Sequence, residues 1–433
     1  MFLTRVFYAG LCLCTALPAL ADGSAQHRRA PLSISADAGR NAAPSLTAFV
    51  RQVWAESPAV QGAKAALEAA RARADGADKP LHNPSLEMDA ERTDISTTSV
   101  GLVQTIDWSD KRGALTRIAG QELKAAEAEL RDTRLRVATE AFEGLVRYST
   151  AREMQMLAQR RGELMRVFID AVEQRRAAGD LGALDVTLAQ VAYSEALMAQ
   201  AAAESERAEA EADLLAVSGV PADRWPTLPA ELAPPPDRAD PALLENLPQL
   251  AVLRHRMEAA RARIALAQRE GQVDPTIGLR AGRDASENLL GVNIEIPLFV
   301  RNNLKTLVRA ASREAVVEEQ AYRDAQRRAL ARLSAAQSRF RNTSRAWQTW
   351  ASSGQQALHR QMDLLENMWQ AGELTATDFL IQARQNIDTQ TTATTLMGEV
   401  WRSAVAWLAA SGQIDSWLGL ATRDTDTNSG EQK

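Results

Sequence analysis

The side chains best able to do chemistry are few and scattered. The chain has four histidines, His27, His82, His255 and His359. They fall in different stretches, and none is paired at the short spacing of a metal site. The only cysteines, Cys12 and Cys14, lie near the start. The sequence contains no glycine-rich phosphate loop, nucleophile elbow or zinc motif. It therefore indicates no enzyme, no cofactor and no metal site.

Charge narrows the possible partners. The 55 acidic and 50 basic residues leave a net charge of −5, and no basic stripe suggests a nucleic acid. Most of the carboxylates lie in long stretches rich in alanine and arginine, where they are interpreted as solvated helix faces balanced by nearby arginines.

Residues 1–21 have the pattern of a secretory signal peptide. Arg5 precedes an apolar run, and Ala19-Leu20-Ala21 forms a small-x-small cleavage site. The alternative is a buried N-terminal helix. Cleavage would remove both cysteines and start the mature chain at Asp22. The small polar residues of 22–44 are expected to form a mobile arm.

Two long proline-free stretches predict helical hairpins. One, from Lys111 to Gly219, turns at Gly179, and the other starts at Asn302 and turns at Gly372. Apolar residues recur at sevens in the first, which is typical of a coiled-coil seam. Glycine can adopt the left-handed conformation that ends a helix and reverses the chain.

The chain contains an internal duplication. Glu-Ala-Ala-Arg-Ala-Arg occurs at 68–73 and again at 258–263, and Gly101 and Gly291 share that offset of 190. Arg92 and Arg283 are 191 apart. The predicted organisation is a first repeat at 45–218, a proline-rich linker at 219–240, a second repeat at 241–412 and a C-terminal tail at 413–433.

Each repeat also carries a predicted β-hairpin, at about 82–108 and about 274–298. There the apolar residues alternate with polar ones around a short polar turn. One interpretation is a small sheet packed on its own helices. The other, which we favour, is a share of a membrane β-barrel, whose strands alternate in this way.

Alternation assigns the strand faces if the barrel interpretation holds. Leu86, Met88 and Ala90 would face lipid. The lumen would then be lined by Glu87, Asp89, Glu91, Asp107, Arg280, Asn293 and Glu295. Five acids against one base predict a preference for cations. The residues expected at the membrane rim are Arg92, Arg283 and Trp108.

With these features the sequence resembles the TolC family of outer-membrane efflux proteins over residues 45–412. The resemblance is carried by the duplication, by Asn83-Pro84-Ser85-Leu86 and by Gly-Leu-Val-Gln-Thr-Ile at 101–106. Ile296-Pro297-Leu298-Phe299 followed by Arg301-Asn302 is most similar to the heavy-metal (cobalt–zinc–cadmium) branch.

The resemblance implies a mainly α fold with a small β part. Three chains would each give four strands to one outer-membrane barrel, and their helical hairpins would form a periplasmic tunnel. The homotrimer would contact outer-membrane lipid, a periplasmic adaptor (membrane fusion) protein and an inner-membrane resistance–nodulation–division pump. It would export small solutes, among them divalent metal cations, from a Gram-negative cell.

The resemblance also implies roles for the turns. The tips at Gly179 and Gly372 would dock the adaptor through Leu181 and Leu374, unless these leucines pack on their own helix ends. Asp378, with its counterpart Asp185, would narrow the periplasmic aperture, unless each only caps its own helix. Two rival functions are a non-channel coiled-coil adaptor or tether, and a channel for organic drugs instead of metals.

Overall fold

A computed structural model of the chain describes residues 42–92, 96–229, 232–236, 240–299 and 301–420. All of the described residues belong to one compact unit. The expected signal peptide, with Cys12 and Cys14, lies outside the described residues. So do His27, most of the expected arm and the chain beyond 420.

The first repeat is built from four helices and one β-hairpin. Its helices are α1 (Pro44–Glu56), α2 (Pro58–Ala77), α3 (Lys111–Ala177) and α4 (Ala183–Ser218). The hydroxyl of Ser57 caps α2 by accepting a hydrogen bond from the Val60 N–H, and Pro58 occupies the first turn, where no backbone donor is needed. α3 runs for 67 residues and packs along α4.

The second repeat has the same order but is not an exact copy. Its helical elements are η2 (Pro241–Asn246), α5 (Pro248–Glu270), α6 (Lys305–Thr349), α7 (Gln355–Gln370), α8 (Ala376–Ser411) and α9 (Ile414–Trp417). The predicted unbroken helix from Asn302 is interrupted by a π turn at Trp350–Gly354. The Trp350 ring occupies the space that a side chain at Gly354 would need, which explains the glycine there.

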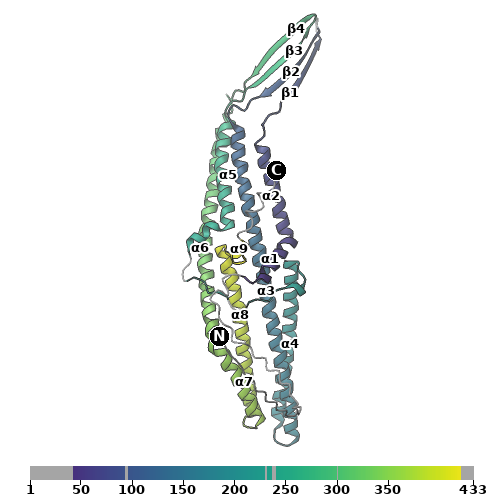
Figure 1. The fold of residues 1–433 in the computed structure, drawn as a ribbon, viewed down its shortest axis with the longest axis vertical. Helices are drawn as coiled ribbons and strands as arrows, with labels where there is room; N and C mark the ends of the chain where they lie inside the picture. Colours follow the sequence, from purple (N-terminus) through teal and green to yellow (C-terminus); the bar gives the residue numbers. More distant parts are fainter. Residues whose placement is uncertain (1–41, 93–95, 230–231, 237–239, 300, 421–433) are drawn as a thin grey trace, which may run out of the picture. The chain divides into compact units, whose positions relative to one another are not determined.

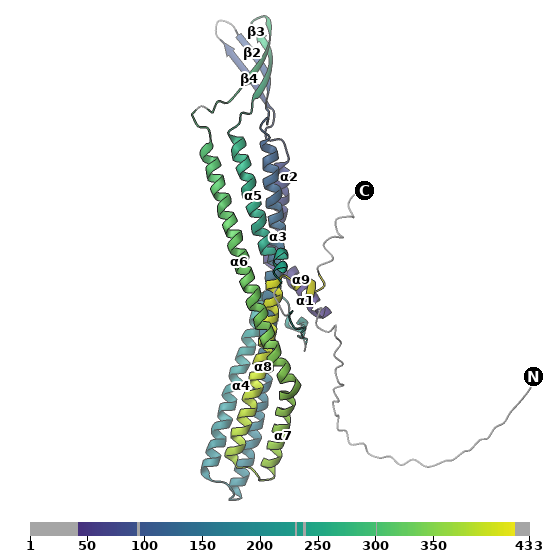
Figure 2. The same ribbon diagram turned by 90° about the vertical axis from the view of Figure 1, so that its left-hand side faces the viewer.

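The two hairpins join into one antiparallel sheet of four strands in chain order. They are β1 (Ser85–Arg92), β2 (Ser96–Thr105), β3 (Thr276–Asp284) and β4 (Glu287–Glu295). β2 of the first repeat pairs with β3 of the second. The sheet lies at one end of the helices, and the α3–α4 and α7–α8 turns lie at the other (Figure 1, Figure 2).

The main core lies midway along the helices, not under the sheet. Phe142 of α3, Trp401 of α8 and the α1 residues Phe49 and Val50 are buried there. Trp417 of α9 packs its ring edge-on against Phe142, with 5.6 Å between centroids. The first residues of the expected C-terminal tail therefore contribute to this core, through Ile414, Trp417 and Leu418.

Candidate functional site

The register of the sheet separates one apolar face from one polar face. Directly opposed residues share a face, so Met88, Val100, Ala281 and Leu290 form one row across the four strands. None of the described helices covers this face, since Met88 is 72% exposed and Leu290 84% exposed. A small sheet packed on its own helices, the alternative left open by the sequence, does not match this exposure.

The opposite face carries most of the charge. The register places on it Glu87, Asp89, Glu91, Arg280, Asp284, Glu287, Asn293 and Glu295. Asp284 and Glu287 were not predicted there, because the sequence assigned them to the turn. In the structure they extend both strands to the tip of the hairpin, and Asp284 accepts a hydrogen bond from the Thr97 hydroxyl at 2.8 Å.

Arg280 is positioned by glycines on both neighbouring strands. Gly101 and Gly291 lie directly opposite it, one on each side. A Cβ at Gly291 would come within 2.8 Å of Nε of Arg280, and one at Gly101 would lie 3.3 Å from its Cβ. The Arg280 guanidinium therefore extends along the polar face at a level where the neighbouring strands, β2 and β4, carry no side chain.

The expected rim residues lie at opposite ends of the sheet. Arg92 and Arg283 are on the apolar face next to the hairpin ends, opposite Ser96 and Thr98. Trp108 lies beyond the other end of β2 and is 77% exposed. An indole at one boundary of an apolar band and arginines at the other suit the two interfaces of a lipid layer.

Asp107 does not belong to the polar face. β2 ends at Thr105, and the Asp107 carboxylate accepts hydrogen bonds from the backbone N–H groups of Lys111 and Arg112 at 2.7 and 2.8 Å. It satisfies donors that the first turn of α3 leaves unpaired, and its charge favours that helix end. The structure thus gives Asp107 a role at the start of α3, outside the strand on which its expected place in a lumen rested.

A buried carboxylate that sequence reasoning missed joins the helices to the sheet. Asp274, just before β3, accepts hydrogen bonds from the Ser109 hydroxyl at 2.7 Å and from Lys111 Nζ at 2.6 Å. Burial would raise the pKa of Asp274, but these hydrogen bonds outweigh it and hold the pKa below its ordinary value. The internal duplication could have pointed to Asp274, because Asp274-Pro275 lies before β3 where Asn83-Pro84 lies before β1.

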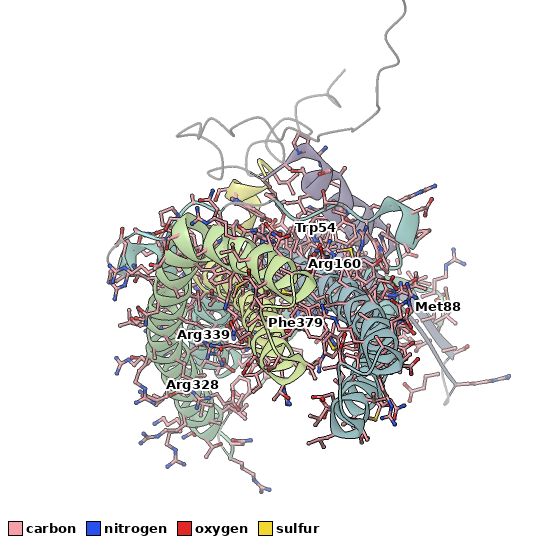
Figure 3. The ribbon with its side chains drawn as sticks, turned by 90° about the horizontal axis from the view of Figure 1, so that it is seen from below. Trp54, Met88, Arg160, Arg328, Arg339 and Phe379 are labelled. Carbon is pink, nitrogen blue, oxygen red and sulfur yellow. The ribbon has the colours of Figure 1, made fainter. Side chains whose placement is uncertain are left out.

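The two turns reverse the chain through left-handed glycines, with φ of +89° at Gly179 and +78° at Gly372. Leu181 and Leu374 are half-buried and pack on a cluster built around Phe168, Trp369 and Phe379. Seen from the turn end, Phe379 lies among the helices (Figure 3). Leu184 instead is 71% exposed.

Both aperture candidates lie in the first turn of their own helices and form hydrogen bonds there. Asp378 accepts a hydrogen bond from the Thr375 hydroxyl at 2.7 Å, and its own N–H donates to that hydroxyl. Asp185 accepts from the Gly182 N–H at 3.1 Å. On the next turn of α8, Ile381 is 60% exposed. The structure thus gives both carboxylates a local role and leaves Asp378 open to solvent.

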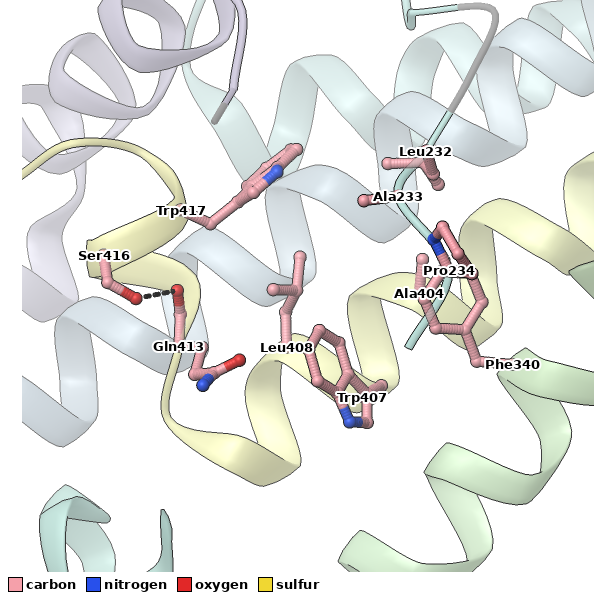
Figure 4. A pocket seen from close by; sticks show the side chains of 10 residues that line it. All are labelled: Leu232, Ala233, Pro234, Phe340, Ala404, Trp407, Leu408, Gln413, Ser416 and Trp417. Carbon is pink, nitrogen blue, oxygen red and sulfur yellow. Dashed lines mark hydrogen bonds between the residues drawn. The ribbon is translucent and has the colours of Figure 1, made fainter. Parts of the chain in front are cut away.

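A concave site of about 330 Å³ lies beside the linker between the repeats. Phe340, Trp407 and Trp417 supply aromatic surface, and Leu232 and Pro234 of the linker close one side (Figure 4). Its polar groups are few, and the Ser416 hydroxyl donates to the backbone carbonyl of Gln413.

The described part of the chain contains no group of three or more His, Cys, Asp or Glu residues that is placed to hold a metal ion. His255 lies with Nδ1 3.0 Å from Oε1 of Gln121, and burial, aided by Arg254, lowers its pKa. No helix among the described residues is long and apolar enough to cross a membrane.

Comparison with known proteins gives one family and a set of similar folds. The family described as outer membrane efflux protein matches residues 49–220 and 241–413, one match to each repeat. This confirms the duplication and the predicted fold class. No curated protein matches the chain.

Solved structures share the fold at low sequence identity. The outer-membrane channel OprN is 18% identical, with a TM-score of 0.71 over 87% of this chain and 91% of its own. CusC is 14% identical, with a TM-score of 0.70 over 88% and 95%. The Campylobacter jejuni outer membrane channel CmeC is 12% identical, with a TM-score of 0.72 over 88% of this chain and 90% of its own.

Proposed function

Because the chain belongs to the outer membrane efflux protein family, we propose that it forms, as a homotrimer, the outer-membrane channel of a tripartite efflux system. In this proposal the sheet contributes to a barrel in the outer membrane of a Gram-negative cell. The helices continue the duct into the periplasm, which the chain reaches through the export signal at 1–21.

The observation that carries the proposal is the division of the sheet into two exposed faces. A soluble protein rarely leaves a large apolar patch in water. A barrel wall has lipid on one side and water on the other, so it accounts for an apolar row such as Met88 to Leu290 behind an acidic face. A periplasmic adaptor or tether would leave that apolar face without a partner.

The charge of the polar face supports small cations as the cargo. Glu87, Asp89, Glu91, Asp284, Glu287 and Glu295 stand against Arg280 alone. Carboxylates on the wall of a water-filled pore attract counter-ions over about 10 Å at about 0.1 M salt. Divalent heavy-metal cations fit this field and the resemblance to the heavy-metal branch, whereas neutral organic drugs would gain nothing from it.

The partners proposed for the opposite end are a periplasmic adaptor and, through it, a resistance–nodulation–division pump. The support is the pair of hairpin turns at Gly179 and Gly372, which lie together at the end away from the sheet (Figure 2). Leu184 is exposed beside the first turn, and Leu181 is not, so Leu184 is the better docking candidate.

The test is ion selectivity in a planar bilayer. Purified protein should give channels whose reversal potential in a salt gradient shows cation preference. Glu87→Gln with Asp89→Asn and Glu91→Gln should reduce it. A matched control neutralises three exposed acids outside the sheet, Asp75→Asn with Asp223→Asn and Glu245→Gln, and should leave it unchanged. Anion preference in the wild type, or equal effects of both triple variants, would contradict the proposal.

A further inference from the structure

The end of the sheet farthest from the helices separates charge by face. β1 follows α2 and β3 follows α5, so the last residues of both strands lie at that end (Figure 1). On the polar face the register aligns one row across the four strands, made of Glu91, Thr97, Asp284 and Glu287. On the apolar face it places Arg92 and Arg283. The last rows of the described strands thus carry three acids on one side and two bases on the other.

The two arginines have no acidic partner within the described part of the chain. Both side chains are exposed, and neither Arg92 nor Arg283 forms an ion pair with another described residue. Arginines of the helices differ, since Arg147, for example, is bridged to Glu206 and Asp213. The acids next to the two arginines in the chain project from the other side of the sheet, because side chains alternate along a strand. Both positive charges are therefore open to an anion from outside the chain.

The spacing of the two arginines suits a ligand with two anionic groups. Arg92 lies opposite Ser96, and Arg283 lies opposite Thr98, two residues farther along β2. Two strand spacings and two residues of rise separate the Cα atoms of the arginines by about 12 Å. One guanidinium can already grip a phosphate through two parallel hydrogen bonds. Two of them at this spacing therefore match two phosphates held apart on one molecule.

The apolar face around the arginines carries small polar side chains. The hydroxyls of Ser96 and Thr98 lie on it, as does the amide of Asn288 opposite Arg283, and all three residues are exposed. Among the described strand residues, no acid shares these two rows. Hydroxyl and amide groups both donate and accept hydrogen bonds, as the hydroxyls of a sugar require.

Apolar surface begins directly beside this polar group. The next row toward the helices is the exposed apolar row that runs from Met88 to Leu290. A ligand that carries phosphates and sugars at one level and acyl chains at the next matches both parts of the surface. A lipid with a phosphorylated sugar headgroup has this arrangement.

We propose that Arg92 and Arg283 bind the two phosphates of one outer-leaflet glycolipid. Its sugars contact Ser96 and Thr98, and its acyl chains lie along the apolar row. The proposal rests on the proposed function, because only a sheet that crosses the outer membrane brings this end to the outer leaflet. Arginines near a membrane surface extend toward the headgroups of any lipid, and the proposed site differs in requiring two phosphates on one molecule.

Thermal dissociation of the purified, delipidated oligomer in detergent tests the site. The probes are lipid A with two phosphates, lipid A with one phosphate, and phosphatidylglycerol, which has one phosphate and no sugar. The first should raise the dissociation temperature of the wild type most. Arg92→Gln with Arg283→Gln should abolish the difference between the probes. Either change alone should reduce the response to the two-phosphate lipid to that given by the one-phosphate form.

The matched control is Arg112→Gln with Arg280→Gln. It also removes two exposed arginines, but Arg280 lies on the polar face and Arg112 lies in α3, so this variant should keep the preference of the wild type. Equal stabilisation of the wild type by all three probes would overturn the proposal. So would a preference for two phosphates that survives the loss of both Arg92 and Arg283.

Retention of lipid gives a readout that does not depend on stability. Wild-type protein extracted from outer membranes in mild detergent should carry glycolipid, counted per chain by mass spectrometry. The variant that lacks Arg92 and Arg283 should carry several-fold less, and the control variant as much as the wild type. Equal retention by the two variants would contradict the site.

Wild-type channels recorded in phosphatidylcholine bilayers, without glycolipid, separate this inference from the proposed function. If the wild type conducts but shows no preference among the lipid probes, only the glycolipid site fails. If it forms no channels and responds to none of the lipids, both proposals fail.

Discussion

Arg175, near the end of α3, stacks on Trp369, near the end of α7. Its guanidinium carbon lies 4.3 Å from the centre of the indole, and Nη2 donates a hydrogen bond to the Trp369 carbonyl at 2.8 Å. The two residues come from different repeats, so this contact ties together the two hairpins at the end away from the sheet.

Replacing Arg175 with Ala should loosen that end. A cation–π contact and a charged hydrogen bond together contribute about 1–3 kcal/mol. We expect faster hydrogen exchange in residues 365–379, measured on the purified oligomer, with little change in α5. Arg176→Ala removes an exposed arginine next along the helix and is the matched control. Equal exchange rates in the two variants would mean that the contact of Arg175 with Trp369 does not hold the two hairpins together.

Asp378 can be tested as an aperture residue apart from its hydrogen bond to Thr375, the cap of α8. Thr375→Ala removes the capping hydroxyl but keeps the carboxylate, whereas Asp378→Ala removes the charge and its hydrogen bond. If the carboxylate narrows the periplasmic opening, only Asp378→Ala should raise single-channel conductance. Similar conductance in both variants would reduce Asp378 to a helix-end residue.

The junction at Asp274 should weaken in acid. Its pKa is depressed in the folded protein, so its hydrogen bonds stabilise the fold above the ordinary value of 3.8 and are lost as the pH falls through the depressed one. Asp274→Asn should therefore lower the thermal midpoint at pH 7, and the difference from wild type should shrink toward pH 3. Asp75→Asn, an exposed acid on α2, should show no such trend. A difference that persists unchanged at pH 3 would show that ionisation of Asp274 is not its source.

The leucines at the turns should separate folding from docking. Leu181→Asp with Leu374→Asp puts charge against the cluster around Phe379 and should lower the thermal midpoint of the oligomer, since buried unpaired charge is costly. Leu184→Asp changes an exposed side chain and should alter the free energy of unfolding by no more than about 0.5 kcal/mol. Its thermal midpoint should therefore stay close to that of the wild type. A thermal midpoint that the double variant leaves unchanged would show that Leu181 and Leu374 are not packed.

Periodicity predicted the architecture because it is a property of many residues at once. The hairpins and the long helices persist over tens of positions, and the duplication at 68–73 and 258–263 ties the two halves together. The faces of the sheet followed from alternation alone, since a β side chain can take only one of two sides.

Single residues at element ends were harder to predict. Asp107 continues the alternation of β2 in sequence, but the chain leaves the strand two residues earlier to begin α3. Ile414 and Trp417 follow Gly412, where the second predicted hairpin ends, and only tertiary packing, such as that of Trp417 on Phe142, makes them part of the core. The π turn depends on how one ring, that of Trp350, lies over one glycine, which no periodic pattern encodes.

The π turn makes the two repeats mechanically unequal. α3 keeps α-helical hydrogen bonds along its whole length. Its counterpart, formed by α6 and α7, changes to π-helical hydrogen bonds between Trp350 and Gly354. A π turn is a local departure from α-helical spacing and a weaker point under bending. In a ring where the two repeats alternate, a stiff helix, α3, would alternate with a more flexible one, the α6–α7 pair. Strain applied at the turns would then concentrate in α7 and spare α3.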